Sequence, residues 1–505
     1  MAANKIKVAY PILLVLAGLG ISFIPGIPQI HIDPELIFII FLPPLLYDAA
    51  WAISWKELWR WRRIVSSFAF IVVFFTALSV AFVANHFIPG FSLALGLLLG
   101  GIVSPPDAVS AGAILKFVKI PKRMASILEG ESLLNDASSL IIFRFALIAV
   151  ATGQFVWYEA AYNFVWMVVG GVGIGLTIGF LFMKLHKFLP TDSNMDIVLT
   201  FLTPYFMYIA AEELHSSGVL AVVAGGLLLS NKRHLFLSSS SRLRGVNVWE
   251  SLVFILNGLV FMLIGLDLPE ITNGLGNVSV VAATGYGVLI TLTLILARMV
   301  SAYGAVVVTL IARNFITVAD ASNPGAKVPF ILGWTGMRGV VSLAAALSIP
   351  IQMENHAFFP QRNLILYITF VVILLTLLVQ GLTLPYLIKR IGIPDNDHSL
   401  PEEQEELHLR QELMGYAYSY LNDRYQTDLN HYPFLQQMAK KWKSHSPVSD
   451  TPAISEEEKV AYLDILDAQR KWLLEKNRSE GLLNEDLIRK QLTYLDLEEE
   501  KMRFI

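Results

Sequence analysis

The 505-residue sequence has no cysteine and is poor in charged residues. Without cysteine the chain can form no disulfide bond, no thiolate metal site and no cysteine nucleophile. It also lacks a P-loop, a dinucleotide-binding glycine pattern, a zinc-ligand spacing, a serine-nucleophile elbow and a basic, aromatic-rich patch, so nothing indicates nucleotide-driven, hydrolytic or nucleic-acid-binding chemistry. Charged residues make up 16% of the chain and hydrophobic residues 55%, with a mean hydropathy of +0.57. Soluble domains average about 25% charged residues, so this composition indicates a polytopic membrane protein.

The charges are divided unevenly along the chain. Residues 391–505 carry 14 Lys+Arg and 23 Asp+Glu, a net charge of −9, whereas residues 1–390 have a net charge of +6. This shift predicts a transmembrane domain over residues 1–390 and a cytoplasmic acidic tail over residues 391–505. Apolar and charged residues alternate at helical spacing in the tail, which favours a small helical appendage. The tail either binds a regulatory partner or is a solvated helix bundle with no special role.

The transmembrane domain is expected to be all-α, with about 12 transmembrane helices. The apolar segments cover residues 8–27, 35–50, 65–86, 92–118, 132–152, 160–183, 195–211, 218–230, 249–267, 278–312, 328–350 and 363–388. If the amino terminus is cytoplasmic, the inner connections hold twenty Lys and Arg residues and the outer connections hold only Arg362. The positive-inside rule therefore places both termini in the cytoplasm.

Two of these spans contain residues that interrupt a helix. The fourth is broken at Ser104–Asp107 by Ser-Pro-Pro-Asp, and the eleventh at Gly333–Gly339 by Gly-Trp-Thr-Gly-Met-Arg-Gly. Proline removes a backbone donor and glycine weakens a helix. The two spans cross the membrane in opposite directions, as an inverted repeat requires, and paired broken helices point to an ion site near the midplane. A proline kink and a glycine packing seam are the simpler alternative.

The candidate ion ligands lie at the start of the fifth span. A charged side chain near the bilayer centre costs about 2.5–3.5 kcal/mol, so charges inside the spans are functional candidates. Ser132 and Asp136 are four residues apart on one helix face, and Glu131 and Asn135 share the adjacent face. Such a stripe of hydroxyl, amide and carboxylate oxygens suits a hard cation such as Na⁺. Asp107, beside the first break, could supply freed carbonyls or orient the site.

A buried aspartate can also carry a proton. Aspartate titrates near pH ~3.9 in water, but desolvation raises that value, whereas a bound cation favours the ionised form. Proton and cation would therefore compete for Asp136. A single titrating carboxylate predicts exchange of one proton for one monovalent cation, with no net charge moved.

The arginines inside the spans need partners. Arg338, in the second break, must find an anion or a cluster of carbonyls. Glu131 is the preferred partner, which would leave Asp136 free to titrate. Arg298 is expected to neutralise another helix end or a carbonyl, and no partner is assigned to Arg144. Other charges and histidines near span ends are expected to be solvated: Asp33, Glu35, Glu212, Glu213, Glu250, Asp267, His86, His186, His215 and His234.

At these residues the sequence resembles the monovalent cation:proton antiporter family, specifically the NhaP-type sodium/proton exchangers. The resemblance runs from about residue 33 to residue 387 and rests on five motifs: Phe41–Asp48, Ser104–Asp107, Gly130–Asp136, Ser217–Ala221 and Gly336–Gly339. It implies an inverted-repeat fold with two discontinuous crossing helices. It also implies a homodimer in which a core subdomain moves against a dimerisation subdomain. Relatives often begin with one more helix, so either this branch lacks that helix or the sequence continues upstream.

The same resemblance implies roles for single residues. Asp136 matches the family's transport aspartate, with Asn135 and Asp107 at matching site positions. Ser132, Glu131 and Arg338 match the other site and core positions. An Asn-Asp pair is similar to the electroneutral branch of the family.

The expected function is secondary antiport of cytoplasmic Na⁺ or Li⁺ for external H⁺ across the plasma membrane, for pH and sodium homeostasis and without a cofactor. K⁺/H⁺ antiport is the nearest alternative. A cation channel is a remote alternative. An intramembrane aspartyl protease built on Asp107 and Asp136 is also remote, because the Gly-x-Gly-Asp pattern of such proteases is absent.

Overall fold

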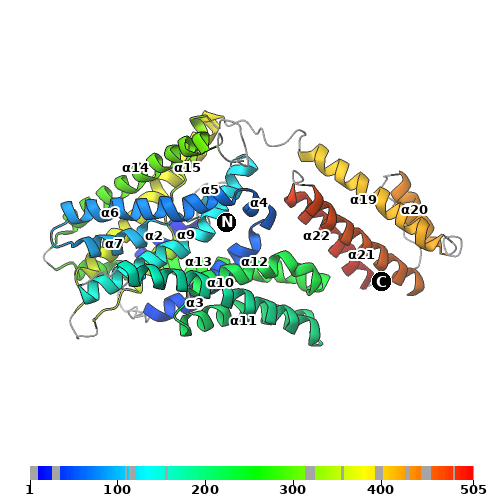
Figure 1. Cartoon of the computed structure of the whole chain (residues 1–505), viewed down its shortest axis with the longest axis horizontal. Helices are drawn as coiled ribbons and strands as arrows, with labels where there is room; N and C mark the ends of the chain where they lie inside the picture. Colours follow the sequence, from blue (N-terminus) through cyan, green and yellow to red (C-terminus); the bar gives the residue numbers. More distant parts are fainter. Residues whose placement is uncertain are drawn as a thin grey trace. The chain divides into compact units, whose positions relative to one another are not determined.

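The computed structural model is helical throughout the part of the chain that it describes (Figure 1). The described residues are 10–24, 34–107, 111–112, 118, 120–153, 157–276, 278–312, 325–353, 358–392, 402–426, 432–444, 456–480 and 484–503. Among them the only extended pairing is an isolated bridge between Gln352 and Phe358. The chain divides into two compact units, here called the membrane unit (Met1–Leu189, Val198–Lys232 and Trp249–Asp395) and the C-terminal unit (Pro190–Ile197, Arg233–Val248 and Asn396–Ile505).

The helices of residues 10–391 follow the predicted apolar segments. They are α2 (Tyr10–Ser22), α3 (Pro34–Ala52), α4 (Trp55–Arg60), α5 (Arg62–Ser66), the π-helix η1 (Ser67–Val72), α6 (Val73–Phe87), α7 (Leu93–Val103), α9 (Lys122–Thr152), α10 (Trp157–Phe188), α11 (Ser193–Glu213), α12 (Gly218–Lys232), the 3₁₀ turn η2 (Arg233–Leu235), α13 (Ser239–Asn273), α14 (Val280–Ala312), α15 (Lys327–Trp334), α16 (Val340–Leu347), α17 (Arg362–Leu375), the π-helix η3 (Thr376–Gln380) and α18 (Gly381–Ile391). Each of the twelve predicted segments overlaps at least one of these helices, so the all-α prediction is confirmed.

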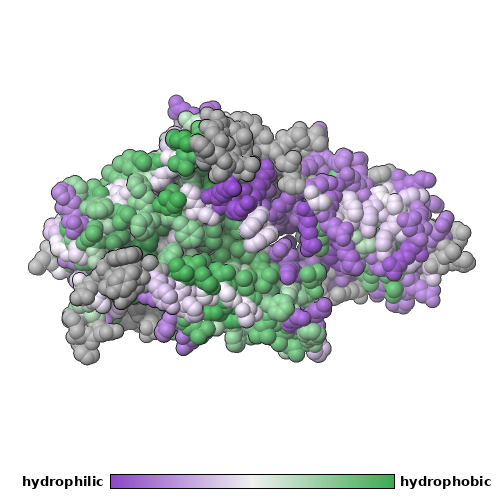
Figure 2. Space-filling view, viewed as in Figure 1, coloured by the Kyte–Doolittle hydropathy of each residue, from purple (hydrophilic) through white to green (hydrophobic). Residues whose placement is uncertain are grey.

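Membrane insertion is supported by helix length and by the character of the surface. Six helical segments among the described residues are long and apolar enough to cross a bilayer, and three shorter apolar helices accompany them. On the face seen in Figure 2, hydrophobic residues predominate over the membrane helices, whereas hydrophilic residues predominate over α19–α22 of the C-terminal unit. An exposed apolar surface of this extent is stable in lipid but not in water.

Both predicted helix interruptions are present. Helix α7 ends at Val103, and the chain is non-helical through Asp107. At the second interruption, α15 ends at Trp334 and α16 begins at Val340. The amide of Asp107 donates to the carbonyl of Met337 at 2.7 Å, so the two interrupted segments contact each other directly. Backbone groups released from helical pairing are thereby partly satisfied inside protein, as lipid-embedded irregular backbone requires.

Glycines bring the helices around the first break very close together. A Cβ atom on Gly100 of α7 would lie 2.4 Å from the carbonyl oxygen of Ala77 on α6, and one on Gly101 would lie 2.9 Å from the amide nitrogen of Phe143 on α9. Helix α7 therefore fits between α6 and α9, and α9 in turn also packs on α12. Helix α9 ends where Gly153 takes a φ of 69°, a conformation that glycine adopts at little cost.

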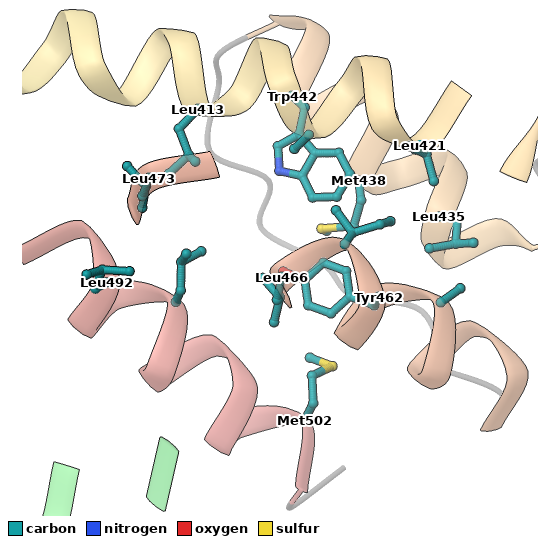
Figure 3. Close-up of a cluster of buried hydrophobic side chains, with 14 of the residues drawn as sticks. Leu413, Leu421, Leu435, Met438, Trp442, Tyr462, Leu466, Leu473, Leu492 and Met502 are labelled. Atoms are coloured by element: carbon teal, nitrogen blue, oxygen red, sulfur yellow. The ribbon is translucent and has the colours of Figure 1, made fainter. Parts of the chain in front are cut away.

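The C-terminal unit has its own hydrophobic core. Its main helices are α19 (Glu402–Tyr425), α20 (Pro433–Ser444), α21 (Glu456–Ser479) and α22 (Glu485–Arg503). Figure 3 shows side chains from all four pointing into one cluster, among them Leu413, Met438, Leu466 and Leu492. The 390/391 domain boundary stays a prediction, and segments 190–197 and 233–248 group with this unit.

Candidate ion-binding site

Helix α9 carries the candidate ligands in its buried first half. Asn135 is fully buried, Asp136 is 8% exposed and Ser132 is half-buried. They lie on a helix that enters the membrane unit between α7 and α12. The predicted stripe of oxygen atoms therefore faces protein and not lipid.

Asn135 connects α9 to the first break. Its amide nitrogen Nδ2 donates to the carbonyl of Pro106 at 3.1 Å. Its Oδ1 atom is buried and has no hydrogen-bond partner among the described residues. A buried acceptor without a partner costs free energy, so this oxygen is available to a cation.

Asp107 lies against the second break. Its carboxylate is so near Gly339 that a Cβ atom there would lie 1.8 Å from Oδ2. It also interacts electrostatically with the carboxylate of Asp136. The structure therefore brings Asp107, Asn135 and Asp136 to the place where the two interrupted helices meet.

Asp136 itself has no side-chain hydrogen bond or ion pair to any other residue in the described part of the chain. The hydroxyl of Ser139 donates to the backbone carbonyl of Asp136, at 3.0 Å, and not to its carboxylate. A buried carboxylate without a cationic or hydrogen-bonding partner is stable only when a proton or a bound cation neutralises it.

The preferred pairing of Glu131 with Arg338 is wrong. Glu131 instead accepts two hydrogen bonds from Arg298 of α14, at 2.6 and 2.9 Å, and both side chains are at most 2% exposed. The Nε of Arg298 donates to the carbonyl of Leu332, as the carbonyl alternative for this residue predicts. The planar guanidinium matches the carboxylate in this two-pronged geometry, so Glu131 is fully paired.

Arg338 binds carbonyls, which was the second possibility for it. Its Nε donates to Val103 at 2.6 Å and its Nη2 to Ser104 at 3.1 Å, while Nη1 donates to Gly336. Val103 and Ser104 end helix α7, where carbonyls lack intrahelical partners and the helix dipole favours a cation. Arg338 thus neutralises the end of one broken helix from within the other.

Arg144 has no partner assigned from the sequence, and Glu212 is expected there to be solvated. In the structure Arg144 of α9 donates to Glu212 at the end of α11, and both side chains are part-exposed. Glu212 is therefore part-exposed at its helix end, but it is paired with Arg144, which the sequence did not predict. Spacing alone did not indicate this pair, since Glu212 follows the seventh predicted span whereas Arg144 lies within the fifth.

Comparison with known proteins gives the family. A family profile described as "Sodium/hydrogen exchanger, transmembrane" matches residues 1–390. The chain belongs to the sodium/hydrogen exchanger family. Together with the spanning helices, this makes the chain an integral membrane protein, and the proteins that it resembles are transporters rather than enzymes.

Several relatives of the exchanger have known names. It is 35% identical over 400 residues to a "Sodium, potassium, lithium and rubidium/H(+) antiporter" of Bacillus subtilis, an alignment that covers 76% of this chain and 58% of that one. It is 34% identical over 422 residues to the "Na(+)/H(+) antiporter ApNhaP" of Aphanothece halophytica, covering 82% and 76%. The exchanger thus spans just over half the length of its Bacillus relative.

A solved structure shows the same fold. The sodium proton antiporter MjNhaP1 of Methanocaldococcus jannaschii at pH 8 aligns with a TM-score of 0.61 and 20% identity, over 77% of the exchanger and 94% of that chain. The expected antiporter fold with two discontinuous crossing helices is therefore confirmed.

Proposed function

We propose that this exchanger is a secondary antiporter that exchanges cytoplasmic Na⁺ or Li⁺ for external H⁺ at Asp136. The observation that carries the proposal is the buried carboxylate of Asp136, which has no side-chain partner among the described residues and lies where the two interrupted helices meet. The names of the relatives support the same ions.

Competition for one carboxylate accounts for the exchange. A cation at Asp136 would gain the free Oδ1 of Asn135 and the nearby carboxylate of Asp107, with Ser132 as a further oxygen. A proton would neutralise Asp136 in the cation's absence. If the carboxylate crosses between the two sides only when neutral, each turn moves one cation against one proton.

The other buried charges would hold the site and not titrate. Glu131 is neutralised by Arg298, and Arg338 by the carbonyl end of α7. Because both arginines remain charged at physiological pH, these pairs would keep the interrupted helices together while Asp136 changes its occupant. Exchange then depends on one titrating group, Asp136. Each cycle therefore moves one cation against one proton and transfers no net charge.

K⁺/H⁺ antiport is the second candidate. It is favoured by the name of the Bacillus relative, which includes potassium and rubidium beside sodium and lithium. A site built from carboxylate and amide oxygens accepts alkali cations of several sizes when its backbone can adjust. Cation competition decides between the two.

We further propose residues 1–390 as the transport domain, residues 391–505 as a cytoplasmic tail, and the plasma membrane as location, with both termini inside. The positive-inside distribution of Lys and Arg supports this orientation. A homodimer is proposed from the family resemblance alone, and a regulatory partner of the tail from its acidic helices.

The test uses proteoliposomes that enclose a pH-sensitive dye. An imposed gradient of Na⁺ or Li⁺ should change the internal pH, and Asp136→Asn should reduce this change to the protein-free background. Glu129→Gln, an exposed carboxylate on the same helix, is the matched control and should keep the response. Absence of a response to Na⁺, Li⁺ and K⁺ in the native chain, or full activity of Asp136→Asn, would overturn the proposal.

A further inference from the structure

An ion pair lies farther along the same helix as the proposed ion site. Arg144 follows Asp136 by eight residues on α9, about 12 Å along the helix axis. In the proposed orientation α9 runs from the cytoplasm outward, so Arg144 lies nearer the outside than Asp136. Its guanidinium donates to Glu212 at the end of α11.

A cavity of about 40 Å³ lies beside this ion pair. Its walls come from five helices and include Leu140 and Arg144 of α9, Phe38 of α3, Met167 of α10, Tyr208 and Glu212 of α11, and Val219 of α12. A space of this size holds water when polar groups line it. Leu140 and Arg144 are four and eight residues beyond Asp136, so the cavity follows the helix face of Asp136 outward.

Glu212 is fixed to its surroundings. Its Oε1 accepts the amide of Gly218 at the start of α12, at 3.0 Å. A Cβ atom on Gly218 would lie 2.8 Å from that oxygen and 2.6 Å from the ring of Tyr208. The preceding turn is packed equally closely on α10, since a Cβ atom on Gly171 would lie 2.6 Å from the carbonyl oxygen of Ser217. Glu212 therefore belongs to a tightly packed block of α10, α11 and α12.

Arg144 lies outside the block of α10, α11 and α12 that holds Glu212. It shares α9 with Asp136, and α9 packs closely on α7 through Gly101 and Phe143. A shift of α9 relative to α10–α12 that exposes Asp136 to the outside would separate Arg144 from Glu212. The pair can thus form in one access state and not in the other.

We propose that the Arg144–Glu212 pair is the outer gate of the exchanger, closing the outward cavity above Asp136. This rests on the proposed antiport. In the closed state the two charges neutralise each other beside the cavity. In the open state Glu212 is released beside the path and presents the first carboxylate oxygen to protons arriving from outside. Arg144 and Glu212 are therefore positioning residues for access.

Thiol labelling tests the gate without reference to transport. The native chain has no cysteine, so Leu140→Cys places a single thiol in the cavity wall. A membrane-impermeant methanethiosulfonate reagent applied from outside should modify it slowly in the native background. Adding Glu212→Gln should speed modification by about fivefold, the change that loss of a part-exposed ion pair supports. Exchanging the charges, Arg144→Glu with Glu212→Arg, should return the rate toward the slow value.

Ala151→Cys is the matched control, because it lies exposed at the far end of α9. Its modification rate should be equal in all backgrounds, and its labelled fraction gives the share of molecules facing outward. Glu212→Asp, which retains the charge, should give an intermediate rate at Leu140→Cys. Equal rates at Leu140→Cys in the native, Glu212→Gln and Glu212→Asp backgrounds would overturn the gate. Loss of dye-reported exchange in the native chain would instead overturn the antiport proposal, because labelling does not depend on it.

Discussion

Each unit of the exchanger buries an aspartate, but the two have different surroundings. Asp496 of α22 is 3% exposed and accepts hydrogen bonds from Arg242 and Arg470 of the same unit. Asp136 of α9 is 8% exposed and has no such partner in the described residues. A buried carboxylate between two arginines keeps its charge permanently, whereas an unpaired one needs a neutralising ion. The comparison separates charges that hold a structure from a charge that is free to exchange its occupant.

The largest effect is expected from breaking the buried pair beside Asp136. Glu131→Gln leaves the charge of Arg298 without a counter-charge, since the amide of Gln and the carbonyl of Leu332 offer only neutral oxygens. Breaking a buried ion pair costs about 3–5 kcal/mol. We expect a clearly lower unfolding temperature in detergent, together with loss of exchange, measured by thermal scanning and by dye flux.

Glu129→Gln on the same helix is the control for this change. Its side chain is exposed, so stability should remain within ~0.5 kcal/mol of the native value. Native-like stability of Glu131→Gln would show that the pair does not hold the interrupted helices together.

The next effect concerns Asp107 and the second break. Gly339→Ala places a Cβ atom 1.8 Å from Oδ2 of Asp107, so the carboxylate must move. We expect the apparent KM for Na⁺ to rise about tenfold, equivalent to ~1.4 kcal/mol of binding, as measured by dye flux over a range of Na⁺ concentrations. Gly304→Ala, where a Cβ atom meets open space, should leave KM unchanged. Equal KM values for the two variants would remove Asp107 from the site.

Much of this arrangement follows from local sequence chemistry. Two prolines before Asp107 and glycines around Arg338 suffice to predict both interruptions, and four-residue spacing suffices to put Ser132 and Asp136 on one face. The partner of Glu131 did not follow, because Arg298 and Arg338 both lie inside predicted spans and only the tertiary structure, which brings Arg298 of α14 to Glu131 of α9, selects between them. Breaking α7 leaves carbonyls without helical partners, and these carbonyls could have indicated the partners of Arg338. Residue spacing alone does not reveal them.

A smaller effect on exchange is expected in the C-terminal unit. Asp496→Asn removes the carboxylate shared by Arg242 and Arg470, of which Arg470 keeps its ion pair with Glu499. Hydrogen bonds to charged groups contribute about 1.5–3 kcal/mol, so this unit should unfold at a lower denaturant concentration while exchange is retained. Glu406→Gln, whose ion pair with Lys490 is part-exposed, is the control and should change stability by less than ~1 kcal/mol. Loss of exchange in Asp496→Asn would show that the paired aspartate also takes part in transport.

The smallest effect is expected on the pH dependence of stability, through His234, which was expected to be solvated. Its Nδ1 is instead buried without a hydrogen-bond partner among the described residues, and His186 is likewise only 5% exposed. Burial, together with Arg233, Arg242, Arg470 and Arg489, lowers the pKa of His234 to about 2. Asp496 and Glu485 are the acidic groups near the same arginines.

The lowered pKa of His234 predicts how the stability of the fold depends on pH. An unfolded histidine titrates near pH ~6.5, so below that pH the unfolded state binds a proton that the folded state excludes, and stability falls as pH falls. Thermal unfolding of the full chain should therefore shift down between about pH 7.5 and about pH 5, and His234→Gln should reduce this shift. His408→Gln, an exposed histidine of α19, should leave it unchanged. An identical pH shift in His234→Gln and the native chain would show that His234 does not titrate in this way.

Proton release on cation binding tests the role of Asp136 most directly. Purified exchanger in weakly buffered detergent solution is titrated with Na⁺ near neutral pH while the released protons are counted. The account predicts about one proton released per bound Na⁺ in the native chain, and none in Asp136→Asn. Sodium binding without proton release in the native chain, or undiminished release in Asp136→Asn, would contradict it.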